Sequence, residues 1–268
     1  MKLQIVDSAN KKTGEITLPS QFHEELRPDL INRAVLAIHS HNRQDYAAHS
    51  EAGKRSSAKL SRRRRDYRGS YGIGISRVPR KIMTRRGTRM NWVGAFAPGT
   101  VGGRRAHPPK TEKIWWMKIN EKERTKSIRS AISATISREI VTARGHKVPD
   151  SYPFILDDSF EAIDKTKKIT DALNQLGFQL EISRVEDKKV RAGKGKSRGR
   201  KYKKKKGPLF VVSKAGNLSN AASNIPGCDV VEVKKLNVEA VAPGGHAGRL
   251  TLWTKSAIEM MDKENLFK

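Results

Sequence analysis

The sequence predicts an α/β protein: a three-layer α/β/α fold with a mainly parallel sheet, plus a long basic internal loop and a second basic excursion. Two observations support this fold class. Short apolar segments alternate with helical patterns in the second half of the chain, and positive charge gathers in two stretches, at about 49–113 and 187–207. We therefore predict a single α/β domain spanning residues 1–268, into which these two basic segments are inserted.

The amino-terminal part of the chain predicts two short strands and a helix. Leu3–Val6 and Glu15–Leu18 have the pattern of strands around a turn at 10–14. Pro28 suits the first turn of a helix, which we expect to fade near Tyr46. The apolar face of this helix would consist of Ile31, Ala34, Val35 and Ile38.

The longest predicted helix follows the first basic stretch. Asn120 and Glu123 have the spacing of a capping box, and Gly145 marks the end of the pattern. Between these signals isoleucine recurs at every fourth position, at Ile128, Ile132, Ile136 and Ile140. The pattern predicts one continuous helix with an apolar stripe.

The carboxy-terminal half alternates between predicted strands and helices. The strands are Phe154–Leu156, Gln179–Arg184, Leu209–Ser213 and Val230–Val233. The helices are Ile163–Leu176, which Gly177 ends, a short helix or turn at 217–224, and a last helix over about 254–264. Strands separated by helices are joined by right-handed crossovers, so we expect a largely parallel sheet that is covered on both faces.

The formal net charge of +28 is concentrated in two stretches of the chain. Residues 49–113 hold eighteen Lys and Arg against three acids, and residues 188–206 hold twelve against none. The remaining sequence is almost neutral. Such separation favours a polyanion-binding surface, because charge that served only solubility would be spread evenly.

The sequence lacks the motifs of nucleotide-dependent and metal-dependent enzymes. Lys194–Ser197 resembles the end of a phosphate-binding loop, but Val190 stands where its first glycine belongs. The glycines of residues 69–74 do not have dinucleotide-binding spacing. The histidines include no H-E-x-x-H motif, and His39 and His41 would point to different faces of a helix. No cofactor or metal is expected.

Acids and cysteine give no catalytic signal either. Asp157 and Asp158 follow a predicted strand, where acids are sometimes catalytic, but capping of the next helix is their commoner role. Cys228 is the single cysteine, which excludes an internal disulfide; we expect it to be a small buried side chain. No apolar run is long enough to span a membrane. We predict a cytoplasmic protein that is not an enzyme and has no membrane partner.

The first basic stretch combines cations, aromatic rings and glycine. Its arginines are spaced among Tyr67, Tyr71, Trp92 and Phe96. Guanidinium groups can bind phosphates or stack on bases, rings can wedge against bases, and glycine lets a thin segment pass between RNA helices. A disordered basic linker is the alternative, although linkers seldom carry four aromatic residues. For any single arginine, phosphate contact is expected ahead of base recognition.

The ends of this stretch have simpler expectations. Arg62 to Arg65 could act as diffuse counterions instead of specific contacts. Trp115 and Trp116 are expected to pack where the insertion rejoins the body. Neither of these roles involves catalysis.

Three segments carry a family resemblance: Ser76–Arg80, Gly102–Lys113 and Lys118–Ile132. The Arg-Ala-His-Pro-Pro-Lys run inside the second is the most specific. Together they closely resemble the archaeal branch of the ribosomal protein four family of the large subunit, over nearly the whole chain. The resemblance implies a three-layer α/β globular domain on the subunit surface, bound to large-subunit ribosomal RNA. It also implies a long internal loop, with its tip near Gly69 to Arg89, that helps form the narrow part of the nascent-peptide exit tunnel.

The resemblance and the charge pattern together predict the partners. These are large-subunit ribosomal RNA, neighbouring large-subunit ribosomal proteins, and the nascent peptide near the loop tip. The predicted RNA contacts are Arg62, Arg63, Arg64, Arg65, Arg68, Tyr71, Arg77, Arg80, Lys81, Arg85, Arg86, Arg89, Trp92, Arg104, Arg105, His107, Lys110, Lys196, Arg198, Arg200 and Lys201. Two other classes stay open: an architectural protein that compacts duplex DNA, and a nucleotide-dependent RNA enzyme, which the sheet would suit but which needs a phosphate loop.

Overall fold

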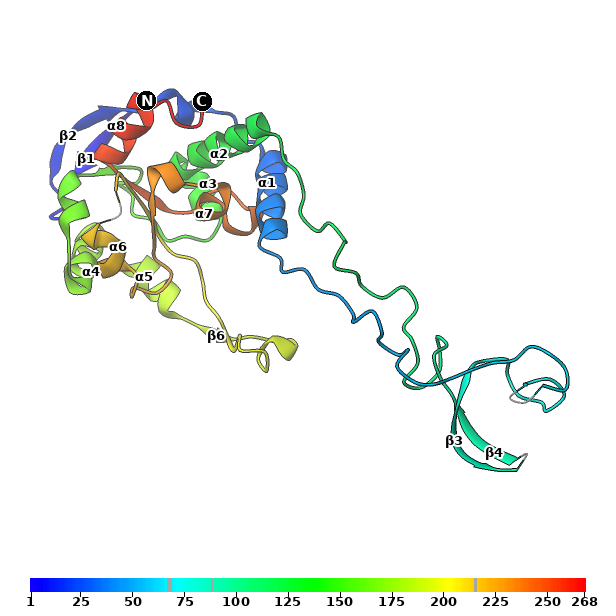
Figure 1. The fold of residues 1–268 in the computed structure, drawn as a ribbon. Coiled ribbons are helices and arrows are strands. Elements are labelled where there is room, and N and C mark those ends of the chain that lie inside the picture. The colour runs from blue at the N-terminus through cyan, green and yellow to red at the C-terminus, as the bar shows by residue number, and fades with distance from the viewer. Residues whose placement is uncertain (67–68, 88, 215) are drawn as a thin grey trace. The chain divides into compact units, whose positions relative to one another are not determined.

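The computed structural model describes residues 1–66, 69–87, 89–214 and 216–268 (Figure 1). The chain divides into two compact units. Unit 1 comprises Met1–Asn42 and Trp116–Lys268, and unit 2 comprises Arg43–Trp115. The predicted RNA contact Arg68, and Tyr67 beside it, lie outside the described residues.

A six-stranded sheet forms the centre of unit 1, in the order β2-β1-β5-β10-β8-β9. The strands are β1 (Lys2–Val6), β2 (Lys12–Thr17), β5 (Ile155–Leu156), β8 (Leu209–Val212), β9 (Asp229–Glu232) and β10 (Thr251–Thr254). All neighbouring pairs are parallel except β1 and β2, which form an antiparallel hairpin at one edge. The prediction of an α/β fold with a mainly parallel sheet is therefore confirmed.

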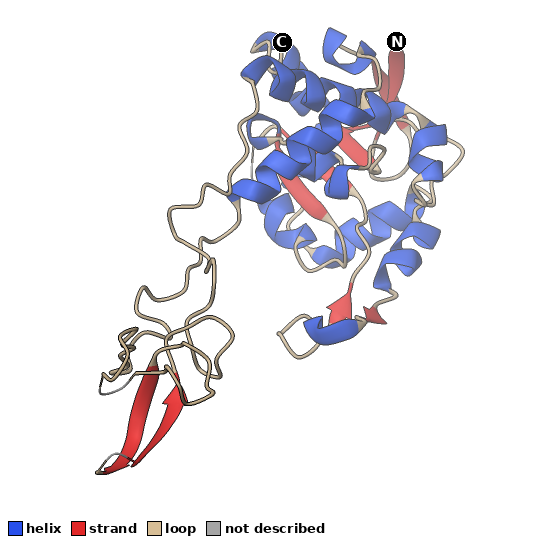
Figure 2. Ribbon diagram, turned by 90° about the vertical axis from the view of Figure 1, so that its right-hand side faces the viewer, coloured by secondary structure: helices blue, strands red, loops and turns tan. Residues whose placement is uncertain are grey.

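Helices connect these strands, as Figure 2 shows in blue. The α-helices are α1 (Pro28–His41), α2 (Glu121–Ile136), α3 (Arg138–Ala143), α4 (Thr166–Gln175), α5 (Gln179–Glu186), α6 (Asn217–Ala222), α7 (Val238–Val241) and α8 (Lys255–Lys263). The 3-10 helices are η1 (Ser20–His23), η2 (Asp158–Ala162), η3 (Gly193–Gly195), η4 (Val233–Lys235) and η5 (Pro243–Gly245). Helix α4 ends as predicted, because Gly177 takes a φ of 87°, which glycine adopts readily.

Successive residues of the central strands join two different core clusters. Leu209 and Val211 of β8 belong to the first cluster, and Phe210 and Val212 belong to the second. Because successive side chains of a strand point to opposite faces of the sheet, the two clusters lie on opposite faces. Burying each large apolar side chain of this kind contributes roughly 1.5–3 kcal/mol.

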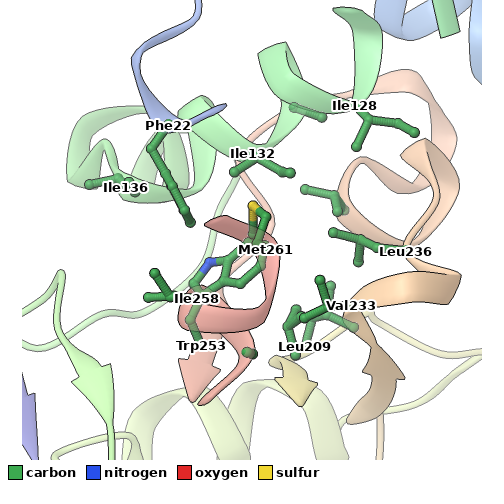
Figure 3. Packing of buried hydrophobic residues seen from close by; sticks show 14 of the residues in the cluster. Phe22, Ile128, Ile132, Ile136, Leu209, Val233, Leu236, Trp253, Ile258 and Met261 are labelled. Carbon is green, nitrogen blue, oxygen red and sulfur yellow. The ribbon is translucent and has the colours of Figure 1, made fainter. Parts of the chain in front are cut away.

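Helices supply the rest of each cluster. In the first, isoleucines of α2 and residues of α8 surround Trp253 (Figure 3). In the second, Ile169 and Leu173 of α4 and Leu218 of α6 cover the other face. The apolar stripes that the sequence shows on these helices are thus the surfaces that cover the sheet.

The long isoleucine-rich helix is two helices and not one. Ser137 separates α2 from α3 and is extended, with φ −76° and ψ 109°. The break has a packing reason: Ile136 belongs to the first core cluster and Val141 to the second, so the chain has to change direction between them. The predicted capping box is also absent, because the Asn120 side chain makes no capping hydrogen bond.

The predicted strand at 179–184 is wrong, since these residues belong to helix α5. Leu180 is 73% exposed and Glu181 is fully buried. A helix places Glu181 and Arg184 on one face, where they bind each other.

The sequence also missed elements of unit 1, among them the strand β10 and the helix α7. Strand β10 lies between β5 and β8, and all four of its residues are buried. It has no polar–apolar alternation, because a strand covered on both faces needs none. The last predicted helix was therefore expected to begin at Thr254, which is the final residue of this strand.

Candidate nucleic-acid interface

Almost none of the described side chains of unit 2 is buried. Within its described residues, Ser70 and Ala95 are the buried ones. The first basic stretch therefore has no apolar core, as its composition predicts. Its arginines and rings are available to an external partner.

An antiparallel hairpin, which the sequence did not predict, presents four of the predicted arginines. It pairs β3 (Arg80–Arg86) with β4 (Arg89–Gly94), and its register shifts between Ile82 and Thr84. At its end Arg86 lies directly opposite Arg89, and Arg85 donates from Nε to the Gly87 carbonyl over 3.3 Å. Like charges opposite one another destabilise a hairpin, so this end favours an anionic partner that separates them.

Arginines and aromatic rings form pairs beside this hairpin. The Arg77 guanidinium lies 4.4 Å from the centre of the Tyr71 ring, and that of Arg80 lies 5.5 Å from the Trp92 ring. Arg80 also donates to the Val78 carbonyl and to Ser76 Oγ, each over 3.3 Å. Such pairs hold a cation and a flat face side by side, which suits an RNA that offers phosphates and bases.

A second aromatic group joins the two ends of unit 2. Tyr46 stacks on Trp115 with ring centres 5.7 Å apart and planes inclined by 20°. Arg43 lies 3.7 Å from the centre of the Trp115 ring, and Lys113 lies 4.2 Å from it. Trp115 thus packs where unit 2 begins and ends. Trp116, in unit 1, makes an edge contact with His41.

The stem of unit 2 is closed by a close backbone approach. A Cβ on Gly53 would lie 2.5 Å from the main-chain nitrogen of Arg104, and the φ of Gly53 is 73°. The predicted contacts Arg104, Arg105 and Lys110 line a hollow of about 420 Å³ beside it. His107, which lies between Arg105 and Lys110 in the chain, has a φ of 46°.

The positive charge of unit 2 has little internal compensation. Within the described residues, ten predicted arginines form no ion pair with an acid: Arg62, Arg63, Arg64, Arg65, Arg77, Arg80, Arg86, Arg89, Arg104 and Arg105. Lys81 and Lys110 form none either. Uncompensated cations on an exposed segment release counterions when they meet a polyanion, which is the main source of affinity in such complexes.

The second basic stretch forms a small excursion from unit 1. Strands β6 (Lys189–Val190) and β7 (Tyr202–Lys203) pair antiparallel, and Arg191 donates from its main-chain nitrogen to the Lys201 carbonyl over 2.8 Å. Lys201 also lies 5.5 Å from the Tyr202 ring. The other predicted contacts, Lys196, Arg198 and Arg200, lie in or after the turn that joins the two strands.

A buried polar cluster that the sequence did not reveal fixes the root of this excursion. The Glu181 carboxylate accepts hydrogen bonds from Arg184 Nε at 2.8 Å and from the main-chain nitrogen of Lys147 at 2.9 Å, and its Oε1 lies 2.7 Å from His146 Nδ1. Burial acts to raise the pKa of Glu181, but these partners hold the pKa below its ordinary value. If the sequence had been assigned a helix at 179–186, the spacing of Glu181 and Arg184 would have placed both on one face and suggested their pairing.

Arg249 is a second buried anchor that sequence reasoning missed. It is almost completely buried and binds Asp229, the Gly207 carbonyl at 3.0 Å and the Ala240 carbonyl at 2.8 Å. Gly207 directly follows the excursion, so Arg249 fixes the point at which the chain enters β8.

The residues weighed as possible catalysts have structural roles. Asp157 accepts from the main-chain nitrogen of Ser159 over 3.4 Å, and Asp158 accepts from that of Ser256 over 2.8 Å, so both cap helices. Burial raises the pKa of the Cys228 thiol to about 12, as expected of a packed side chain. In the described part of the chain no group of His, Cys, Asp and Glu side chains could hold a metal ion. No described helix is long and apolar enough to cross a membrane.

The fold and the interface define an α/β protein that carries extended, uncompensated basic segments. Residues 16–264 match the Ribosomal protein L4/L1 family, to which the chain belongs. It is 47% identical over 268 residues to "Large ribosomal subunit protein uL4" of Nanoarchaeum equitans, with all of both chains covered. The proteins of that name from Archaeoglobus fulgidus and Methanococcoides burtonii are 43% identical over 265 residues and 46% identical over 259. Coverage is 97% of this chain and 98% of the former, and 96% of each chain for the latter.

Proposed function

We propose that the chain is a structural constituent of the large ribosomal subunit, that it binds large-subunit ribosomal RNA, and that unit 2 helps line the nascent-peptide exit tunnel. Membership of the family over residues 16–264 is the observation that carries the first part. The arginines without acidic partners support RNA binding, since exposed cations of this density bind phosphates. As a ribosomal constituent the protein works in the cytoplasm.

The interface suggests how unit 2 binds. The stem, with Arg62 to Arg65 on one arm and Arg104 and Arg105 on the other, would contact phosphates through charge. The pairs Arg77–Tyr71 and Arg80–Trp92 would engage bases or ribose as well, because each offers a ring beside a cation. Contact with the nascent peptide is proposed for the tip of unit 2, near Gly69 to Arg89.

The same proposal covers the organisation of the chain. Unit 1 would be a single three-layer α/β/α domain, interrupted by the loop at about 49–113 and by the excursion at about 187–207. Core clusters on both faces of the sheet support the three layers. The excursion would contact RNA through the predicted residues Lys196, Arg198, Arg200 and Lys201. Neighbouring ribosomal proteins are the further partners, and the protein would catalyse no reaction and hold no cofactor.

A sedimentation experiment tests this function. A tagged copy of the full-length protein, expressed in its own organism, should sediment with large subunits after a high-salt wash that removes loosely bound proteins. Density maps of those subunits should then place residues 69–89 at the tunnel wall. A protein found only in the soluble fraction, or on chromosomal DNA, would contradict the proposal.

A further inference from the structure

A groove of about 830 Å³ on unit 1 includes none of the residues predicted to bind RNA. Arg144, which follows helix α3, lines it together with Lys203 of β7 and His246. Part of its wall is apolar and includes Ile140 and Ala247. Its lining contains three basic side chains and no acidic one.

The Arg144 guanidinium is held in place by a glycine-rich turn. Nη2 donates to the Pro243 carbonyl over 2.7 Å, and Nη1 donates to the Ala247 carbonyl over 3.2 Å. Gly244 and Gly245 take φ values of 78° and 83° between these carbonyls, which side chains with a Cβ would resist. A guanidinium has five N–H donors, so about three remain for a ligand.

The charge of Arg144 is uncompensated. The two arginines whose charges act on it have acidic partners, since Arg184 binds Glu181 and Arg249 binds Asp229. Within the described residues Arg144 forms no such pair. Burial, and then the positive charges of Arg249 and Arg184, lower the pKa of Arg144 to about 10. An anion in the groove would relieve this unfavourable field.

Two other hollows of unit 1 lack this property. One, of about 520 Å³, is lined by Lys206 but also by Asp229 and Glu239. Another, of about 530 Å³, sets four lysines of the excursion against Glu186 and Asp229. Both hollows carry their own counter-charges, whereas the Arg144 groove would need an external one.

We propose that the Arg144 groove binds phosphate groups of large-subunit ribosomal RNA, so that unit 1 contacts RNA through a site other than the predicted contacts of its excursion. The inference rests on the proposed function. The planar fork of Arg144 matches two phosphate oxygens, and Lys203 and His246 offer separate donors for adjacent phosphates. The apolar wall beside Ile140 suits a ribose, which an acidic peptide side chain would not supply.

Three matched substitutions test the groove, each removing one positive charge from the full-length protein. Arg144→Gln and Lys203→Gln alter the groove, and Lys167→Gln alters the exposed face of helix α4 outside it. With large-subunit ribosomal RNA as the probe, each groove variant should bind about ten-fold more weakly. The slope of log affinity against log salt should fall by about 0.7–0.9 for each lost contact, while Lys167→Gln keeps the wild-type slope.

Folding and function are separated by two further readouts. Arg144→Gln could disturb the turn at 243–248, so melting temperatures are compared, and Lys203→Gln provides the variant whose side chain is exposed. A density map of large subunits should show RNA phosphates within hydrogen-bonding distance of Arg144. Wild-type affinity and slope in both groove variants, or an acidic protein segment or only solvent in the groove, would overturn the inference and leave the proposed function intact. Absence of the chain from large subunits would instead contradict the proposed function, and the inference with it.

Discussion

Arg184 donates a hydrogen bond to the main-chain oxygen of Lys206 over 2.7 Å while it also binds the buried carboxylate of Glu181. Lys206 is the last residue of the second basic stretch, and Glu181 lies inside the folded part of unit 1. The basic excursion is therefore fixed at its root by a buried charge, although its turn is exposed. The exposed and the buried parts of unit 1 meet at this contact.

Removing that buried charge should destabilise unit 1. We expect Glu181→Ala to lower the free energy of unfolding by about 3 kcal/mol, because it leaves Arg184 and His146 without their shared acceptor. Urea denaturation of the full-length protein measures the change. Glu186→Ala is the matched control, since Glu186 is exposed on the same helix, and it should change stability by less than about 0.5 kcal/mol. Equal effects of the two substitutions would show that the cluster contributes nothing specific.

The same carboxylate should make stability fall in acid. The folded state holds the pKa of Glu181 below its ordinary value of 4.5, so the unfolded chain binds protons first as the pH falls. The contribution is fully present above about pH 5 and is lost as the pH falls through the lower, folded-state pKa. We expect the stability difference between wild type and Glu181→Gln to shrink from pH 6 to pH 4 in urea titrations. A difference that stays constant over this interval would exclude Glu181 as the titrating group.

The sequence predicted those elements of unit 1 whose burial follows a simple period. Helix α1 and strand β8 lie where their apolar residues indicate, because one face or both faces are covered uniformly. Helix α5 was missed because its buried residue is Glu181, which only the tertiary partners His146 and Arg184 make favourable inside. The period of apolar residues predicts which apolar side chains are buried, but it does not reveal a buried charge whose partners satisfy it.

The candidate interface was predictable in composition but not in geometry. Runs of positive charge can be read directly from the amino-acid sequence, so the arginines of unit 2 could be named in advance. The pairing of Arg77 with Tyr71 could not be, since the five positions between them follow no regular helix or strand. Arg144 was overlooked for another reason: it lies in a nearly neutral part of the chain, and only the fold brings it beside Lys203 and His246.

Limited proteolysis should distinguish the two kinds of segment in the free protein. We expect trypsin to cut first between Lys54 and Lys113 and between Lys188 and Lys206, because these stretches have basic, exposed side chains and few buried ones. The remainder of unit 1 should persist as a compact product on gels and by mass spectrometry. Cleavage of the segments at 121–136 and 166–175 at the same rate would contradict this expectation.

RNA binding should depend strongly on salt and still prefer ribosomal RNA. If about ten phosphates are neutralised, the affinity should fall by several decades between 50 and 200 mM salt. At equal salt, large-subunit RNA should bind more tightly than duplex DNA of equal length, because stacking pairs such as Arg80–Trp92 need unpaired bases or ribose. Filter binding across a salt series measures both. Equal affinity for the two would favour an architectural protein that binds any duplex.

The stem and the tip of unit 2 should have separable roles. The stem carries Arg62 to Arg65 on one arm and Arg104, Arg105, Lys110 and Lys113 on the other. The segment 70–89 contains strand β3 and the Arg77–Tyr71 pair. Replacing Ser70–Arg89 by a short glycine linker leaves the anchoring charges of the stem, so the variant should still enter large subunits.

The tunnel of such subunits should change instead. We expect a wider passage in density maps, together with altered sensitivity to tunnel-binding antibiotics and to stalling peptides in translation assays, because the rings and arginines of the tip would no longer occupy its wall. Replacing the segment 194–201 by glycine is the control, since it holds five Lys and Arg against six in 70–89: it removes a similar charge from the excursion and should leave the passage unchanged. Failure of the tip variant to incorporate would make the tip an assembly determinant. Incorporation with an unchanged tunnel wall would place residues 70–89 elsewhere in the subunit.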